Sequence, residues 1–246
     1  MVVGLGGVGS WAVEALARTG LGKLILVDMD DICISNVNRQ IHATPAAVGR
    51  SKALLMAERV AAINPECDVV VVNSFFTERT LESVFSHNPT VVIDAIDRVT
   101  NKTLLIATCV QRGIPLVTTG SAGNRADPSS IVVADLAHTV HDPLLSFVRK
   151  KLRSKYAFSR APNKKFKVPC VYAPLQRNTG YRSAPSRCRV EGEEGFTGLS
   201  ESASSARTCS DGMGTACFVT GTVGFFAASE AVKLILSHSV DASSAA

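Results

Sequence analysis

The sequence predicts an α/β fold, a Rossmann-like and mostly parallel sheet with helices on both faces, and two observations lead to that prediction. At the start, three apolar residues run into Gly4-x-Gly6-x-x-Gly9, and an amphipathic stretch follows. That order is typical of the strand, glycine turn and helix N-terminus of a nucleotide-binding βαβ unit. Beyond it, short apolar runs alternate with helical patterns through the first half of the chain, which favours a parallel sheet.

After the first strand, helices and strands are predicted in alternation up to residue 119. The helical patterns cover Val8–Thr19, Ala46–Ile63, Glu78–Ser86 and Asn101–Arg112, and the strand patterns cover Lys23–Val27, Asp68–Val72, Val91–Asp94 and Pro115–Thr119. Continuous apolar runs such as residues 69–72 indicate strands that are buried on both faces. Right-handed crossovers between such strands place the helices on the two faces of the sheet.

The pattern changes after residue 120. We expect one more strand over Ile131–Leu136, which can be antiparallel, a basic helix over Pro143–Tyr156, and a final apolar helix over roughly Ala216–Leu236. Residues 157–212 show little periodicity and are rich in Ser, Arg, Pro and Gly. The chain is therefore divided into a nucleotide-binding domain (1–156), a basic, partly irregular and mobile insertion (157–212), and a C-terminal helix that returns to the core (213–237).

Composition narrows the class of protein. Seven scattered cysteines, with no CxxC pair, argue against a disulfide framework and a zinc ribbon, and favour an intracellular, reducing compartment. Residues 212–229 carry no charge and just reach the length of a membrane span, but Glu230 and Lys233 interrupt the continuation. A buried core or dimer helix is the favoured interpretation, and a membrane span is the alternative.

The first strand has only Met1–Val3 before the glycine turn, which is shorter than a usual strand of about five residues. We therefore expect further residues upstream of this sequence. A targeting segment would lie there, so a mitochondrial location stays open beside the cytoplasmic one.

The glycine turn predicts a phosphate site, because free N–H groups and the helix dipole attract anions there. A carboxylate about 20 residues further on can hold a ribose hydroxyl. The residues assigned to the nucleotide on these grounds are Gly4, Gly6, Gly7, Gly9 and Asp28.

The polar loop after the second strand offers further phosphate ligands. Arg39 supplies a planar cationic fork, and Asn36 and Gln40 supply neutral donors. Lys52, which opens the next helix, can deliver a second positive charge, although a solvated surface lysine is the alternative reading.

Two carboxylates follow the strand over Val91–Asp94, at the edge where α/β proteins bind ligands. Asp97 can hold Mg²⁺ between phosphates, whereas Asp94 can simply accept backbone hydrogen bonds. Lys102, one turn into the following helix, is predicted to point to the same mouth. The small-residue loop 118–123 either lines a substrate pocket or is a plain turn.

Taken together, these motifs resemble the adenylating superfamily that includes the sulfur-carrier adenylyltransferases and the ubiquitin-activating enzymes. The matching runs are Gly4-x-Gly6-x-x-Gly9, Asp28-x-Asp30, Ser35-Asn36-x-x-Arg39-Gln40, Gly49-x-x-Lys52 and Asp94-x-x-Asp97. Within that superfamily the chain is most similar to the tRNA threonylcarbamoyladenosine dehydratase family. The supporting runs are residues 38–43, 92–97, 114–120, 135–144 and 218–231.

The resemblance implies a ThiF-type fold and an ATP-dependent reaction over residues 1–156. It implies adenylation of the carboxylate of threonylcarbamoyladenosine in tRNA, followed by ring closure, with ATP and Mg²⁺ as cofactors. Arg39, Lys52 and Asp97 would be catalytic, Asp97 would be the metal ligand, and Asp30 would join the nucleotide site. A homodimer is also expected. The family has an arginine-bearing segment before the first strand, for which this sequence offers no counterpart.

Charge segregation predicts a nucleic-acid surface. Residues 143–190 hold thirteen Lys or Arg and no Asp or Glu. Such a segment fits phosphate binding, with an anionic membrane surface or a disordered basic tail as alternatives. The residues assigned to tRNA are Lys102, Arg149, Lys150, Lys151 and Arg153.

Three other functions remain open from sequence. The chain could adenylate the C-terminus of a ubiquitin-like or sulfur-carrier protein, although the missing CxxC pairs count against the latter. It could be a non-catalytic ATP-binding relative. A dehydrogenase is the most distant reading, because Arg39 and Lys52 would then have no role.

Overall fold

The computed structural model of the chain describes residues 1–175 and 214–244, in which seven strands form one sheet in the order β3-β2-β1-β4-β5-β7-β6. The strands are β1 (Val2–Val3), β2 (Lys23–Val27), β3 (Asp68–Val72), β4 (Val92–Asp94), β5 (Leu116–Thr119), β6 (Val132–Asp135) and β7 (Pro169–Tyr172). All neighbours pair in parallel except β6 and β7, which are antiparallel. The predicted Rossmann-like sheet is confirmed.

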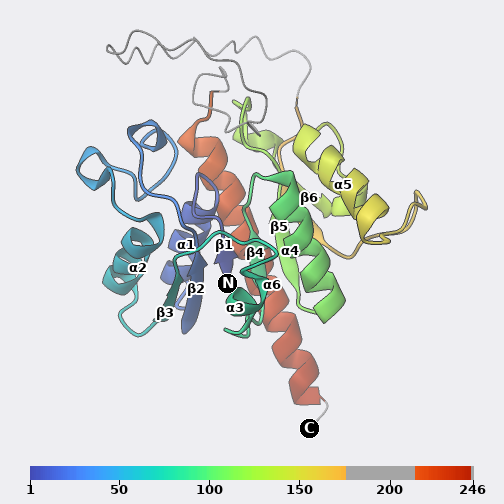
Figure 1. The fold of residues 1–246 in the computed structure, drawn as a ribbon, viewed down its shortest axis with the longest axis horizontal. Helices are drawn as coiled ribbons and strands as arrows, with labels where there is room; N and C mark the ends of the chain where they lie inside the picture. The colour runs from blue at the N-terminus through green and yellow to red at the C-terminus, as the bar shows by residue number, and fades with distance from the viewer. Residues whose placement is uncertain (176–213, 245–246) are drawn as a thin grey trace.

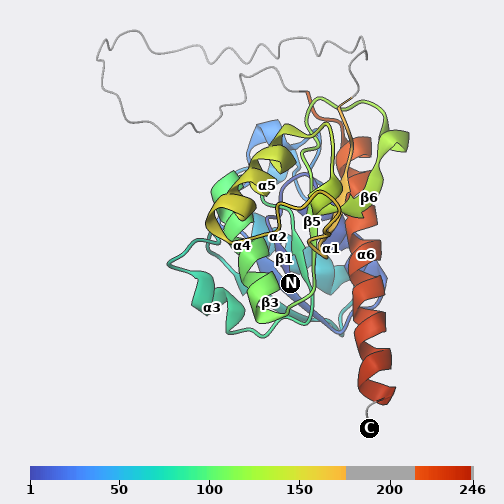
Figure 2. The same ribbon diagram turned by 90° about the vertical axis from the view of Figure 1, so that its right-hand side faces the viewer.

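Helices cover both faces of the sheet (Figures 1 and 2). One face carries α1 (Gly9–Arg18), α2 (Lys52–Ile63) and α6 (Cys217–Ser244), and the other carries α3 (Leu81–Phe85), α4 (Val99–Arg112) and α5 (Pro143–Lys155). Successive strand residues point to opposite faces, so the inner strands contribute side chains to two separate cores, one on each face of the sheet.

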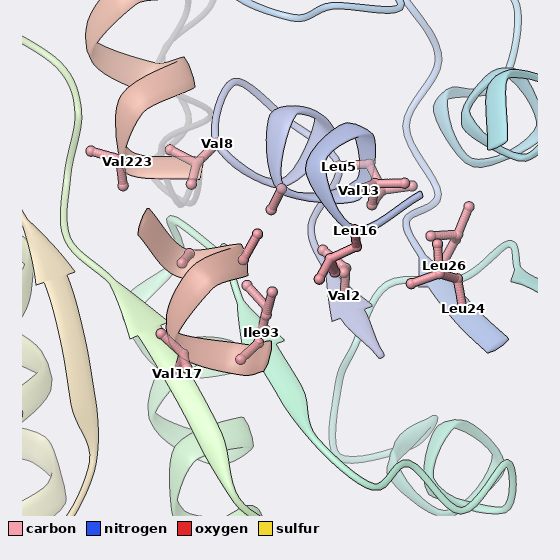
Figure 3. Close-up of a cluster of buried hydrophobic side chains, with 14 of the residues drawn as sticks. Val2, Leu5, Val8, Val13, Leu16, Leu24, Leu26, Ile93, Val117 and Val223 are labelled. Carbon is pink, nitrogen blue, oxygen red and sulfur yellow. The ribbon is translucent and has the colours of Figure 1, made fainter. Parts of the chain in front are cut away.

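Figure 3 shows the core beneath α1 and α6, which contains Val2, Ile93 and Val117 from neighbouring strands, and in which Val223 of α6 lies beside Val8. Their sequence neighbours, Val92 among them, join the core beneath α4 and α5. Burial of both faces explains why the strands are continuous apolar runs.

The glycine turn is sterically obligatory. Gly4 has φ +89°, and a methyl group on Gly9 would lie only 1.8 Å from the carbonyl oxygen of Gly4. A methyl group on Gly4 would itself lie 2.9 Å from the Ala95 carbonyl oxygen. The turn therefore packs directly on the loop that follows β4, as the Gly-x-Gly-x-x-Gly pattern predicts.

Most predicted elements are confirmed. The structure places β2 and β3 at their predicted limits, and β6 is antiparallel. Helix α2 begins at Lys52, later than predicted, because Ser51 caps it by accepting the Leu54 N–H at 3.5 Å.

Strand β7 corrects the expectation that residues 157–212 are irregular. It lies between β5 and β6, and Phe166 just before it packs edge-on against Phe158 with ring centroids 4.9 Å apart. A four-residue strand that begins with Pro169 gives too short a pattern to be recognised from sequence. The remainder of the predicted insertion, residues 176–212, lies outside the described residues.

Helix α6 lies along α1 (Figure 2), and Val223, Ala227 and Ala231 are buried in the core on that face of the sheet. The contact is close at Gly224, where a methyl group would lie 2.7 Å from the Val8 carbonyl oxygen. Among the described residues, Cys217–Ser237 of α6 is long and apolar enough by composition to cross a membrane, and 44% of its most apolar stretch is buried.

Candidate nucleotide-binding site

The carboxylate of Asp28 connects the glycine turn to the end of β2. Its Oδ2 accepts the Leu5 N–H at 2.6 Å and its Oδ1 accepts the Asp30 N–H at 2.8 Å. Burial raises the pKa of Asp28 above its usual value, and these two amide donors oppose the rise. Asp28 therefore shapes the phosphate turn in addition to the ribose contact that the sequence predicts.

Arg39 lies directly over the glycine turn. A methyl group on Gly7 would be 3.3 Å from Arg39 Cδ, so the arginine stem runs across the turn. The Arg39 carbonyl accepts the indole N–H of Trp11 at 2.9 Å and the hydroxyl of Thr220 at 3.3 Å. Its guanidinium donates to the Ser35 carbonyl at 2.6 Å. The predicted phosphate arginine is thus held at the turn by residues from α1 and α6.

Lys52 and Asp30 form an ion pair at the start of α2. Lys52 Nζ lies 2.8 Å from Asp30 Oδ2, with the lysine side chain 8% exposed and the aspartate 52% exposed. The backbone closes the same contact, because the Lys52 N–H donates to the Asp30 carbonyl at 3.0 Å. Asp30 therefore contributes by holding Lys52, and an arriving phosphate would compete for the same ammonium.

The predicted neutral donors have different surroundings. Asn36 is buried and accepts the Cys33 N–H at 3.1 Å, which stabilises the loop. Gln40 is also buried, and its Nε2 lies 3.9 Å from the position of a methyl group on Gly6. Its Oε1 has no hydrogen-bond partner in the described part of the chain, so an unsatisfied amide lies beside the turn.

Two buried polar groups near the site were missed from sequence. The Ser10 hydroxyl and both ring nitrogens of His42 lack hydrogen-bond partners among residues 1–175 and 214–244. Burial lowers the pKa of His42 to about 4, with smaller contributions from Lys52 and Arg59, so the imidazole is neutral at pH 7. His42 could have been noticed from the sequence, because it lies two residues after Gln40, within a run of predicted site residues.

Lys102 is not the RNA ligand that the sequence predicted. Its Nζ lies 3.0 Å from Asp94 Oδ2, and both side chains are 0% exposed. The same ammonium donates to the Ile96 carbonyl at 3.0 Å, and Thr118 donates to Asp94 at 2.7 Å. Burial raises the pKa of Asp94, and Lys102 opposes the rise. This prediction was wrong because α4 begins at Val99 and directs Lys102 under the sheet edge.

The buried pair supports the loop that carries Asp97. That loop packs on the glycine turn through Ala95, and Asp97 beyond it is exposed. Asp97 is therefore an exposed carboxylate in the loop that packs on the glycine turn through Ala95. The described residues contain no group of three or more His, Cys, Asp or Glu side chains that could hold a metal by themselves.

The predicted RNA-binding residues of α5 are partly engaged within the protein. Arg149 donates to the Thr139 hydroxyl, and burial lowers its pKa. Lys151 donates to Thr100 at 2.9 Å, and Arg153 stacks over the Phe166 ring with 5.4 Å to the centroid. Lys150 is exposed. The helix therefore presents a cationic surface in which several charges also fix its position.

The glycine turn follows β1, Arg39 and Lys52 follow β2, and Asp97 follows β4, which are three neighbouring parallel strands. The sequence profile of the ThiF family matches residues 1–245. The chain belongs to the ThiF family. It is 41% identical over 239 residues to the tRNA threonylcarbamoyladenosine dehydratase of Haemophilus influenzae, covering 96% of this chain and 84% of that protein. The enzyme of that name from Escherichia coli is 44% identical over 238 residues, covering 96% and 85%.

Solved structures agree with this membership of the ThiF family. The crystal structure of the Escherichia coli tRNA N6-threonylcarbamoyladenosine dehydratase in complex with ATP matches with a TM-score of 0.79 and 42% identity, covering 98% of this chain and 86% of that one. A complex of the same enzyme with AMP matches with a TM-score of 0.79 and 43% identity, covering 97% and 86%. The predicted family and ThiF-type fold are confirmed.

Proposed function

We propose that this chain is an ATP-dependent tRNA threonylcarbamoyladenosine dehydratase. The observation that supports the proposal is the placement of the Arg39 stem across the glycine turn, with Lys52 paired to Asp30 in the loop that Asp28 joins to the same turn. ATP and AMP complexes of a relative at 42–43% identity support nucleotide binding at such a site.

The reaction activates a carboxylate, which is a poor electrophile because its leaving group would be oxide. A carboxylate oxygen of the threonylcarbamoyl group attacks the α-phosphorus of ATP, and pyrophosphate departs. A nucleophile of the same group then attacks the acyl carbon, AMP leaves and a proton is lost, so the tRNA loses one water overall. Ring closure is intramolecular, and effective molarity removes the need for a covalent enzyme nucleophile.

The residues of the chain act by neutralising charge and by orienting the phosphates. Arg39 and Lys52 would face the phosphate oxygens as the carboxylate approaches, each contributing on the order of 3 kcal/mol. Asp28 would accept a hydrogen bond from a ribose hydroxyl and would hold the glycine turn against the phosphates.

Asp97 is the residue that fits Mg²⁺. One exposed carboxylate beside a phosphate site suits this ion, which is usually held by one or two carboxylates together with substrate phosphates. The ion would supply charge neutralisation on the phosphates. Asp97→Asn is therefore expected to raise the magnesium concentration needed for half-maximal turnover, measured in a magnesium titration. An unchanged requirement would place the ion elsewhere.

The substrate, assembly and location follow as further parts of the proposal. The tRNA would lie along the basic face of α5, and a homodimer would cover the exposed aromatic residues of α6, such as Phe218 (53% exposed) and Phe226 (42% exposed). The five cysteines in the described residues are all unpaired, which supports a reducing compartment. We place the protein in the cytoplasm, with mitochondria as the alternative.

Mass spectrometry of tRNA incubated with the protein and ATP tests the function. We expect the modified adenosine to lose one water, and the loss to require ATP and Lys52. Pyrophosphate exchange stimulated by a small carrier protein rather than by modified tRNA would instead identify a carrier-activating enzyme. ATP binding without any exchange would identify a non-catalytic relative.

A further inference from the structure

An open cavity of about 380 Å³ lies at the N-terminal end of α5, at the same carboxyl edge of the sheet as the glycine turn. It is lined by His141, Asp142, Pro143, Ser146, Arg149 and Leu175. Its volume is that of a small ligand site, and none of the predicted nucleotide contacts lines it.

The floor of the cavity is preorganised. Asp142 is 3% exposed, accepts from Arg125 Nη2 at 3.0 Å, and also accepts the Ser121 N–H at 3.0 Å. Arg125 is 8% exposed and donates through Nε to the Ala173 carbonyl at 2.8 Å. This buried pair joins the loop after β5, the start of α5 and the end of β7. The cavity therefore has a fixed shape.

A short chain of contacts links this cavity to the nucleotide mouth. Thr119, at the end of β5, donates to the Asp94 carbonyl at 3.1 Å, and Asp94 begins the loop that ends in Asp97. Ser121, two residues further along, contacts the cavity floor through Asp142. The cavity therefore borders the loop after β5, and β5 is the strand next to β4, which Asp97 follows.

Helix α5, which borders the cavity, carries both positive charge and an exposed aromatic ring. Phe147 on α5 is 61% exposed, Val140 is 52% exposed, and Arg149 and Lys150 lie on the same helix. An exposed aromatic ring beside cations is the arrangement on which single-stranded nucleic acids stack their bases. The helix over Pro143–Lys155 contains no acidic residue, which gives it the charge that complements RNA.

We infer that this cavity binds the unpaired, modified nucleoside of the RNA substrate, with Phe147 stacking against a base and Arg149 facing an anionic group. The inference rests on the proposed function, and it identifies the part of the chain that selects the substrate. Because a base within a stack cannot reach ATP, the nucleoside must be turned outward, and a preformed cavity beside the mouth would receive it.

Binding of an RNA stem-loop, with and without the threonylcarbamoyl modification, tests the inference without requiring turnover. We expect Phe147→Ala to weaken binding of the modified stem-loop about tenfold, while Phe147→Tyr restores it and ATP affinity stays unchanged. Arg149→Met should abolish the preference for the modified over the unmodified stem-loop.

Lys150→Met is the matched control on the same helix. It should weaken both stem-loops equally and flatten the salt dependence, as expected for a phosphate contact. The inference is overturned if Phe147→Ala binds the modified stem-loop like the wild type, or if its loss matches that of Lys150→Met for both RNAs. A wild-type protein that prefers the modified stem-loop but removes no water would contradict the dehydratase assignment and leave the cavity assignment standing.

Discussion

The segments that follow β2 and β4 lie on either side of β1 in the sheet, and each contains an aspartate paired with a lysine in the first turn of the next helix. The pairs are Asp30 with Lys52, and Asp94, the last residue of β4, with Lys102. In the first loop, the Lys52–Asp30 pair opens to the mouth, because the aspartate side chain is 52% exposed. In the second loop, Lys102 and Asp94 are both 0% exposed and are held by further hydrogen bonds. The surroundings therefore decide whether such a pair can exchange partners with a phosphate or serves only to support a loop.

The largest expected effect is a loss of stability when the buried Lys102–Asp94 pair is broken, because that pair serves a structural role. Lys102→Met leaves the Asp94 carboxylate buried without its cation, and we expect it to lower the free energy of unfolding by roughly 3–5 kcal/mol. Urea denaturation measures this loss. Adding Asp94→Asn should recover part of it, since the double variant buries no charge. A Lys102→Met protein of wild-type stability would contradict the structural role.

For the Lys52–Asp30 pair we expect a large loss of activity with little loss of stability. Lys52→Ala should reduce adenylate formation by about a hundredfold, because the phosphates lose a cation worth on the order of 3 kcal/mol. Its unfolding free energy should change by about 1 kcal/mol or less, since the remaining Asp30 is half exposed. Pyrophosphate exchange and urea denaturation on the same preparation give both values. If Lys52→Ala unfolds readily but still forms adenylate, the Lys52–Asp30 pair is structural and is not part of the phosphate site.

The contrast between the two loops also marks what the sequence can predict. The glycine turn, β2 and β3 follow from local patterns. The proposal that Arg39 and Lys52 share one site rests on their positions in the segment between β2 and β3. The direction of Lys102 could not be predicted, because it depends on where α4 begins and on the hydrogen bonds that Asp94 finds across the sheet. Strand β7 could not be predicted either, because its four residues form a strand by pairing with β5 and β6.

The position of Arg39 depends on a distant part of the chain, and a conservative change at Trp11 should reveal this. Trp11→Phe removes the N–H that the Arg39 carbonyl accepts at 2.9 Å. The loss of one partly buried hydrogen bond, about 1 kcal/mol, should raise the KM for ATP about fivefold. Steady-state kinetics measures this change. Phe225→Leu is the control, because it alters packing on the same ring, 5.9 Å between centroids, and keeps the N–H. Equal effects of both variants would mean that packing alone matters.

The last expected effect appears only at acidic pH and concerns His42, a buried residue whose pKa is lowered in part by Lys52. Its pKa falls from 6.5 to about 4 on folding. Between pH 6.5 and pH 4 the imidazole is therefore protonated in the unfolded chain but remains neutral in the folded chain. Stability is therefore full above about pH 6.5 and declines as the pH falls toward 4, by at most about 1.4 kcal/mol per pH unit. Urea denaturation at several pH values should give a shallower decline for His42→Gln. Lys52→Met should also reduce the slope, because removing that cation raises the pKa of His42, and an unchanged slope in both variants would place the acid sensitivity in other groups.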